Sequence, residues 1–170
     1  ISVLALMTAL GLIMFMIESM FPPLFFPGAK MGLSNIFSLL TLILYGLPEA
    51  LLVAAARTVL GRLFAGNASL LLYSLTAGIV SVCVSRLLFA FPKISILCVS
   101  IVSAVVHNCV QLFVYFLQTQ TPLIFSELPY LVLLGVLAGV IVGITVIVTV
   151  KAIPLSVFER VAGGKRKKSN

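Results

Sequence analysis

The chain of 170 residues contains no Asp and no Trp, and its only acidic residues are four Glu. Without Asp there is no Asp-rich magnesium site for diphosphate chemistry, no Walker B carboxylate and no aspartyl phosphate. The sequence also lacks a P-loop and a Ser-His-Asp set, and its one His and three separated Cys form no metal-binding pattern. We therefore expect a protein that is not an enzyme and has no catalytic residue, metal or cofactor of its own.

Charged residues are also scarce, at 9% of the chain, whereas hydrophobic residues make up 62%. A soluble domain of this size needs a more polar surface, and a disordered chain needs more charge. A bilayer core about 30 Å thick takes about 20 apolar residues per helical span, so the chain has room for about six spans at most. The composition predicts an all-α integral membrane protein, with a single six-transmembrane-helix bundle over residues 1–153.

Prolines, glycines and short polar segments separate the apolar runs. The segment 22–30 contains three prolines and Gly28, so it cannot form a regular helix although it is apolar. Pro48 and Glu49 suit the first turn of a helix. The expected spans are residues 1–19, 31–47, 49–64, 69–91, 94–117 and 130–153.

The basic residues are distributed unevenly along a chain whose net charge is +7. The tail 154–170 carries five of the eleven Lys and Arg residues, which beside a final span indicates the cytoplasmic side and contact with anionic lipid, not nucleic acid. Lys93 precedes the fifth span, whereas the loop 118–129 has no Lys or Arg. The positive-inside rule then predicts a multi-pass protein of the cell membrane with both termini in the cytoplasm. Arg62, near an expected outer end, departs from this rule.

Several polar residues stand where lipid would not accept them. An ionisable side chain at the centre of a bilayer costs about 2.5–3.5 kcal/mol, so it normally faces a cavity or a partner. His107, Gln111 and Tyr115 follow at steps of four and share one face of the fifth span, with His107 about 20 Å from the start of the span at about 1.5 Å per residue. This stripe predicts a substrate pocket in the outer half of the membrane. The alternative for His107 is a hydrogen bond between helices.

Arg57 lies about 12 Å into the third span at about 1.5 Å per residue, which is too deep for its head group to reach water easily. Acidic partners are few, and Glu18 is the one candidate in the outer half. Because Lys30 and Arg62 are also expected on that side, cations exceed acids there. An anionic group of a substrate, such as a phosphate or carboxylate, would balance the excess. An internal pair with Glu18 remains the alternative.

Small residues form two helix faces. Ala5, Ala9 and Gly11 lie on the first span, and glycines at steps of four, namely Gly135, Gly139 and Gly143, lie on the sixth. Such faces let helices approach closely, so each serves intramolecular packing or docks a separate membrane protein. The cysteines, Cys83, Cys98 and Cys109, have no paired spacing, and we expect small packing residues without a disulfide.

The arrangement resembles a known family of membrane proteins. The residues 30–35, the segment Gly46-Leu47-Pro48-Glu49-Ala50 and the pair Ala56-Arg57 are similar to the second and third helices of the substrate-binding (S) components of energy-coupling-factor transporters. More narrowly, Glu18-Ser19, residues 27–35, Tyr73-Ser74-Leu75 and the pair His107 and Gln111 resemble the Gx transporter family, which is also labelled heptaprenyl diphosphate synthase component I.

The resemblance implies a subunit that binds a vitamin or cofactor in the outer half of the membrane, beneath the first loop. Ala5 and Ala9 would contact the transmembrane coupling subunit, and two cytoplasmic ATPases would supply energy. A synthase activity fits poorly, because prenyl diphosphate synthases use paired Asp-rich magnesium sites.

We therefore expect capture of a small, anionic organic cofactor or precursor for uptake, and both flavin-like and prenyl-diphosphate-like ligands fit. The expected substrate-binding residues are Lys30, Asn35, Arg57, His107, Gln111 and Tyr115. A non-catalytic membrane partner of a prenyl diphosphate or quinone biosynthesis enzyme is the alternative, and a solitary channel is a third possibility.

Overall fold

The protein is built from α-helices, as seen in a computed structural model that describes residues 2–20, 32–66 and 70–153. No strand occurs in these residues, which confirms the all-α prediction. Lys30 and the basic tail 154–170 lie outside the described residues. The elements are α1 Ser2–Met20, α2 Asn35–Leu44, α3 Leu47–Phe64, α4 Leu71–Leu88, α5 Ile96–Thr119, the short 3-10 helix η2 Pro122–Glu127 and α6 Leu128–Ala152.

Four segments are long and apolar enough to cross a membrane, which indicates a multi-pass membrane protein: α1, α4, α5 and the segment Pro122–Ala152. The other two helices, α2 and α3, are not among these four, although α3 agrees closely with the expected span 49–64. The ten residues of α2 reach only about 15 Å, roughly half of a bilayer core. In α3, Glu49, Arg57 and Arg62 interrupt the apolar sequence.

The second expected span, 31–47, is wrong in its bounds. Gly32 has a φ of 80° and Gly46 a φ of 105°, which are backbone conformations that glycine adopts without strain. The first precedes the turn that leads into α2. Gly46 lies between the two helices: α2 ends at Leu44, and α3 begins at Leu47 directly after this glycine.

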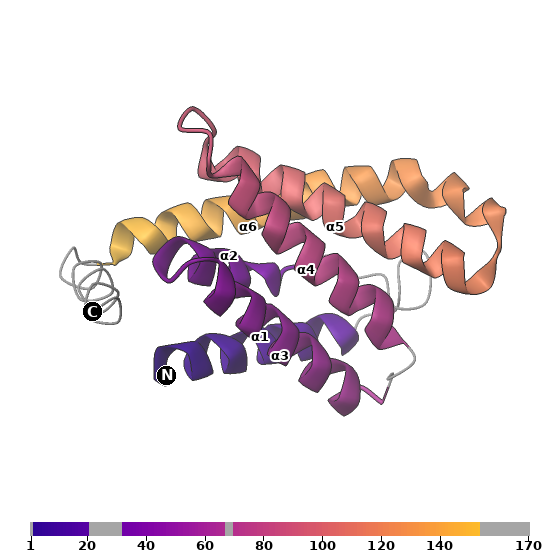
Figure 1. The fold of residues 1–170 in the computed structure, drawn as a ribbon, viewed down its shortest axis with the longest axis horizontal. Coiled ribbons are helices and arrows are strands. Elements are labelled where there is room, and N and C mark those ends of the chain that lie inside the picture. The colour runs from indigo at the N-terminus through magenta and orange to yellow at the C-terminus, as the bar shows by residue number, and fades with distance from the viewer. Residues whose placement is uncertain (1, 21–31, 67–69, 154–170) are drawn as a thin grey trace.

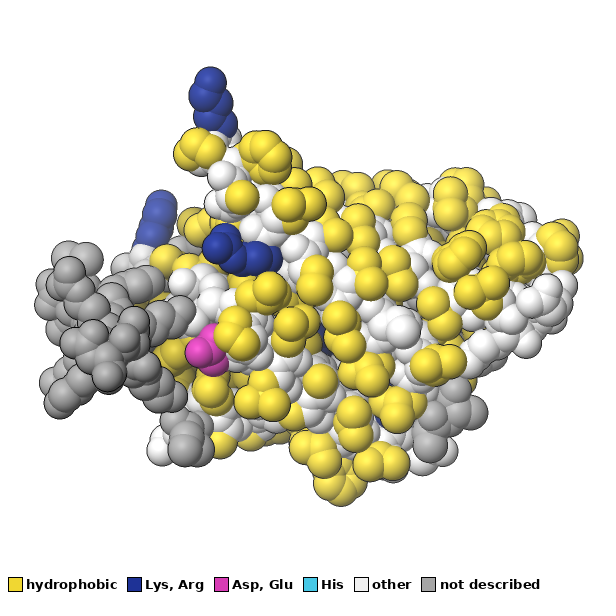
Figure 2. Space-filling model, viewed as in Figure 1, with side chains coloured by type: hydrophobic (Ala, Val, Ile, Leu, Met, Phe, Trp, Pro, Cys, Tyr) yellow, Lys and Arg dark blue, Asp and Glu magenta, His cyan; other side chains and the backbone are white. Residues whose placement is uncertain are grey.

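The helices form one bundle in which neighbours in sequence mostly pack together, while α1 packs chiefly on α3, and α2 also contacts α4 and α6 (Figure 1). α5 packs on α4 and, most extensively, on α6, whereas α3 contacts α4, α2 and α1. The beginning of α1 and the end of α6 lie at the same end of the bundle (Figure 1). In Figure 2 most of the visible surface is hydrophobic, and the Lys and Arg side chains that project from it lie toward this same end.

The glycines of α6 bring its backbone against α5. A Cβ added at Gly139 would lie 2.6 Å from the Cα of Ile101, and one added at Gly135 would lie 3.0 Å from the Cα of Val105. The Oγ of Ser100 also donates a hydrogen bond of 2.8 Å to the carbonyl of Gly139. The glycine face therefore serves intramolecular packing.

α1 is the most peripheral helix, because its buried residues are only Gly11 and Phe15. A Cβ added at Gly11 would lie 3.0 Å from Cδ of Arg57, and the ring of Phe15 occupies the space over Gly61. Ala5 and Ala9 are exposed, so their face is left open by the described part of the bundle.

The three cysteines are free, and two of them do not pack inside the bundle as expected. Cys83 and Cys98 are exposed on α4 and α5, and only Cys109 is half-buried.

Candidate functional site

Arg57 lies at the middle of α3 and holds the beginning of α2. Its Nη1 donates to Oγ of Ser34 and its Nη2 to Oδ1 of Asn35, each at 2.5 Å, while its Nε donates to Oγ of Ser38 at 3.2 Å. The side chain is 2% exposed. All three acceptors are neutral. They satisfy the hydrogen-bond donors of the guanidinium but supply no negative charge.

Glu18 joins α1 to the same end of α2. Its Oε1 accepts a hydrogen bond of 2.7 Å from the backbone N–H of Leu33, and its Oε2 accepts one of 3.4 Å from that of Ser34. A carboxylate at the N-terminus of a helix satisfies unpaired N–H groups and interacts favourably with the helix dipole. The hydrogen bonds of Glu18 thus go to the turn before α2. Its interaction with Arg57 is electrostatic and involves no direct hydrogen bond between the two side chains.

Arg62 is part of the site, although it was not among the predicted binding residues. Oγ of Ser74 on α4 accepts hydrogen bonds from Nε and Nη2 of Arg62. The guanidinium carbon lies 5.4 Å from the ring centroid of Phe15 and 5.9 Å from that of Tyr73, so aromatic faces stabilise the cation. Its departure from the positive-inside rule was the signal in the sequence.

The predicted stripe on α5 turns inward at two of its three positions. His107 and Gln111 are buried, whereas Tyr115 is half-buried and packs edge-on against Tyr73 with ring centroids 5.9 Å apart. Nδ1 of His107 is buried and has no hydrogen-bond partner among the described residues. Asn108 points to α6 instead, where its Nδ2 donates to the carbonyl of Leu131.

These side chains surround one cavity, which we call the arginine cavity. Its volume is about 20 Å³, which is room for about one or two water molecules. Of the predicted binding residues in the described part of the chain, Tyr115 alone is absent from its lining. The cavity is lined by Phe15, Glu18, Gly32, Ser34, Asn35, Arg57, Thr58, Arg62, Ser74, His107 and Gln111.

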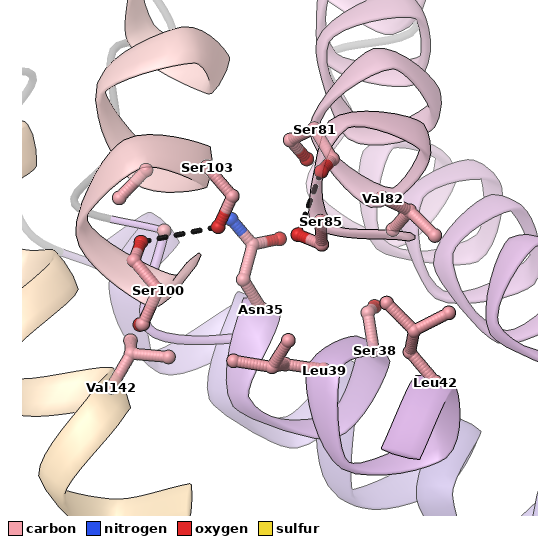
Figure 3. A pocket seen from close by; sticks show the side chains of 12 residues that line it. Asn35, Ser38, Leu39, Leu42, Ser81, Val82, Ser85, Ser100, Ser103 and Val142 are labelled. Carbon is pink, nitrogen blue, oxygen red and sulfur yellow. Dashed lines mark hydrogen bonds between the residues drawn. The ribbon is translucent and has the colours of Figure 1, made fainter. Parts of the chain in front are cut away.

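A second cavity, which we call the serine cavity, lies beside the first and was not predicted. Its volume is again about 20 Å³. Gly32 and Asn35 line both cavities. Figure 3 shows the amide of Asn35 between the serines of α4 and those of α5. Its polar wall comprises Asn35, Ser38, Ser81, Ser85, Ser100 and Ser103, and its apolar wall comprises Leu39, Leu42, Val82, Ala104 and Val142.

The charges of the arginine cavity suit an anion. Arg57 and Arg62 line it with Glu18 as the one carboxylate of the lining, so one positive charge is in excess if His107 is neutral. Two guanidinium groups beside one carboxylate make the cavity favourable for a negatively charged group. Among the described residues there is no group of three His, Cys, Asp or Glu side chains that could hold a metal ion.

The comparisons with known proteins assign a family. Residues 7–149 match the family described as heptaprenyl diphosphate synthase component I. No curated protein and no solved structure matches the chain. The matched residues include both cavities and most of the described helices, and the sequence resembles the same family in the motifs around Arg57 and His107. The chain therefore belongs to the heptaprenyl diphosphate synthase component I family.

Proposed function

We propose that the protein is the substrate-binding membrane subunit of an uptake system for a small, anionic vitamin, cofactor or precursor. The observation that carries the proposal is the pair of arginines, each 2% exposed, in the lining of one cavity that has a single carboxylate. Both guanidinium groups are hydrogen-bonded to neutral side chains, and two cations beside one carboxylate among the described lining residues favour an anionic ligand. The protein acts as a binder and not as an enzyme.

A ligand larger than water requires the arginine cavity to widen. Among the described helices α1 is the one best suited to move, because it packs mainly on α3 and α2 and buries only Gly11 and Phe15 of its own residues. Phe15 lies in the cavity lining, and its ring covers Gly61. A shift of α1 would therefore move both the aromatic wall and Glu18 away from the arginines.

Energy for uptake would come from separate subunits, as in the energy-coupling-factor transporters that the sequence resembles. The exposed face of Ala5 and Ala9 is the proposed contact with a transmembrane coupling subunit, which works with cytoplasmic ATPases. In this arrangement the chain crosses the cell membrane six times, with the short α2 as the second crossing. Both termini are then cytoplasmic, and the arginine cavity lies nearer the outer surface.

The second candidate is a non-catalytic membrane partner of a prenyl diphosphate or quinone biosynthesis enzyme. The family description favours it, because "component I" of a synthase implies another component. The absence of Asp from the chain then places the chemistry on the partner. An excess positive charge in the arginine cavity would suit a diphosphate in this case as well.

Purification in a mild detergent followed by native mass spectrometry tests the proposal. We expect a co-purified organic anion together with a coupling subunit and ATPases. Recovery with a soluble, Asp-rich synthase would support the second candidate. A preparation that never carries or binds an organic ligand would contradict the uptake proposal.

A further inference from the structure

Most of the serine hydroxyls around the serine cavity already donate their hydrogen to a backbone carbonyl. Oγ of Ser81 donates to the carbonyl of Gly78 at 3.0 Å, and Oγ of Ser85 donates to that of Ser81 at 2.8 Å. On α5, Oγ of Ser103 donates to the carbonyl of Ser100 at 3.1 Å. A hydroxyl has one hydrogen to donate and two acceptor lone pairs. The serines therefore offer the cavity acceptor oxygens.

Ser100 follows the same pattern, whereas the amide of Asn35 also brings N–H donors on its α5 side (Figure 3). The hydroxyl of Ser100 donates to the carbonyl of Gly139, and Oδ1 of Asn35 accepts from Arg57. Figure 3 shows acceptor oxygens on the α4 side and on the α5 side of the Asn35 amide. A hydroxyl or N–H group that enters between them can donate to the lone pairs that these oxygens still have, whereas a hydrocarbon gains no hydrogen bond there.

The two cavities meet at Asn35. Its amide hydrogen-bonds Arg57 in the arginine cavity and also lines the serine cavity. On α5, His107 and Ser103 are four residues apart, so they lie one turn apart on the same face. If the two cavities, each of about 20 Å³, widen together when α1 moves, one small molecule can place an anionic group near Arg57 and His107 and an adjacent group among the serines.

We propose that the serine cavity is the second part of the substrate site and binds an uncharged portion of the substrate that carries hydroxyl or N–H donors. This inference rests on the proposed function and narrows its substrate class. It favours a hydroxylated anion, such as a sugar- or polyol-phosphate-like compound, over a prenyl diphosphate, whose hydrocarbon chain has no donors.

The test compares ribitol phosphate with pentyl phosphate, which share a phosphate and a carbon chain of equal length and differ in their hydroxyls. Binding is measured by isothermal titration calorimetry on the full chain in lipid nanodiscs. We expect ribitol phosphate to bind at least about ten-fold more tightly, since a few neutral hydrogen bonds suffice for this ratio. The double variant Ser81→Ala/Ser103→Ala should bring the two affinities close together by weakening ribitol phosphate alone.

Ser126→Ala is the matched control. It removes the same kind of hydroxyl-to-carbonyl hydrogen bond, from Ser126 to Leu123, at an exposed position on η2 away from both cavities. We expect it to leave both affinities unchanged. A melting curve for each variant separates lost binding from lost folding.

Equal affinities, tighter pentyl phosphate binding or a preference that survives the double variant would overturn the inference and leave a cavity that holds water only. Failure of both phosphates to bind would overturn it too. The proposed function is decided separately by the co-purified ligand. A prenyl or other donor-free anion found there would support uptake while contradicting the role of the serines, and a preparation without any organic ligand would contradict uptake itself.

Discussion

Arg57 combines two roles that sequence patterns cannot separate. It lines the cavity that suits an anion, and its guanidinium also donates to Ser34, Asn35 and Ser38 at the beginning of α2. Removing its charge should therefore affect both ligand binding and the position of α2.

We expect Arg57→Gln to weaken ligand binding by about ten- to a hundred-fold, because a buried charge-assisted hydrogen bond contributes about 1.5–3 kcal/mol. The melting temperature should fall only slightly, so that ligand binding is affected more strongly than stability. Titration calorimetry with the co-purified ligand and a melting curve measure the two effects. Arg57→Lys is the control, since it keeps the charge but loses the planar fork that reaches several acceptors. Normal binding with early melting would identify a structural anchor, and the anionic substrate would then lose its support.

His107 offers a cleaner separation of binding from stability. Its Nδ1 is buried without a partner among the described residues, and such an atom costs free energy in the folded state. The ring also has a hydrogen bond with the backbone of Ala77 on α4, so His107→Leu loses that bond while it removes the unpaired Nδ1. We expect these two effects to leave the melting temperature little changed, whereas ligand binding weakens by several-fold. Thermal unfolding and calorimetry on the same preparations check both.

The neighbouring Asn108 is the matched comparison for His107. Its Nδ2 donates to the carbonyl of Leu131 on α6 and faces away from the arginine cavity. Asn108→Leu should lower stability by about 0.5–1.5 kcal/mol, the value of one buried hydrogen bond, and leave binding unchanged. If the two variants behave alike, His107 serves packing between helices and not the ligand.

At the scale of the element, the sequence predicted helices better than turns. The apolar runs that became α4, α5 and α6 end within a few residues of their expected bounds, since Pro, Gly and polar residues stop them. α2 was misjudged because its limits depend on Gly32 and Gly46, whose positive φ values cannot be read from an apolar sequence. Hydrophobicity alone also could not show that α2 is too short for a full span.

The site was predictable where it follows helix periodicity. Steps of four placed His107 and Gln111 on one face, and both line the arginine cavity. Tyr115, one turn further along, is not in the lining of this cavity and packs against Tyr73, so its binding role stays a prediction. The serine cavity was missed because serines in membrane helices commonly bond to their own backbone, so that only the approach of α4, α5 and α2 gives them a shared surface.

The face of α1 predicts an interaction surface. We expect Ala5→Leu and Ala9→Leu to leave ligand binding intact and to weaken co-purification with a coupling subunit, because larger side chains separate helices that need close approach. Both alanines are exposed, so these changes meet no described residue. Gly11→Leu is the control that should disturb binding, since its new side chain would collide with Arg57. Loss of folding in the alanine variants would show that they pack within the chain.

The α5–α6 contact predicts a stability difference between two identical substitutions. A Cβ at Gly139 would lie 2.6 Å from Cα of Ile101, whereas one at Gly78 on α4 meets nothing closer than Oγ1 of Thr58 at 4.0 Å. Gly139→Ala should therefore lower the free energy of unfolding by about 1–3 kcal/mol through overpacking. Gly78→Ala should be neutral or stabilising, because Ala has the higher helix propensity. Equal melting curves for the two variants would show that α6 can shift away from α5 without cost.

At the scale of the whole molecule, polarity differs between the two ends of the bundle. Arg86 lies in the last turn of α4 and Lys151 in the last turn of α6, and Lys93 follows in the connection before α5. The opposite end carries no Lys or Arg in η2 or the residues around it. The arginine cavity lies toward that second end, since Glu18, Arg62 and Gln111 occupy the last turns of α1 and α3 and the second half of α5.

This asymmetry predicts the orientation that uptake requires. In a variant whose own cysteines are replaced, we expect Gln120→Cys to react with a membrane-impermeant maleimide in intact cells, and Lys93→Cys to react only after the membrane is opened. The reason is that cytoplasmic loops retain Lys and Arg. Both positions are exposed in the structure, so burial does not explain a lack of labelling. The reverse pattern would turn the arginine cavity toward the cytoplasm, where it could not capture a nutrient from outside, and would favour a membrane partner that presents a cytoplasmic anion to an enzyme.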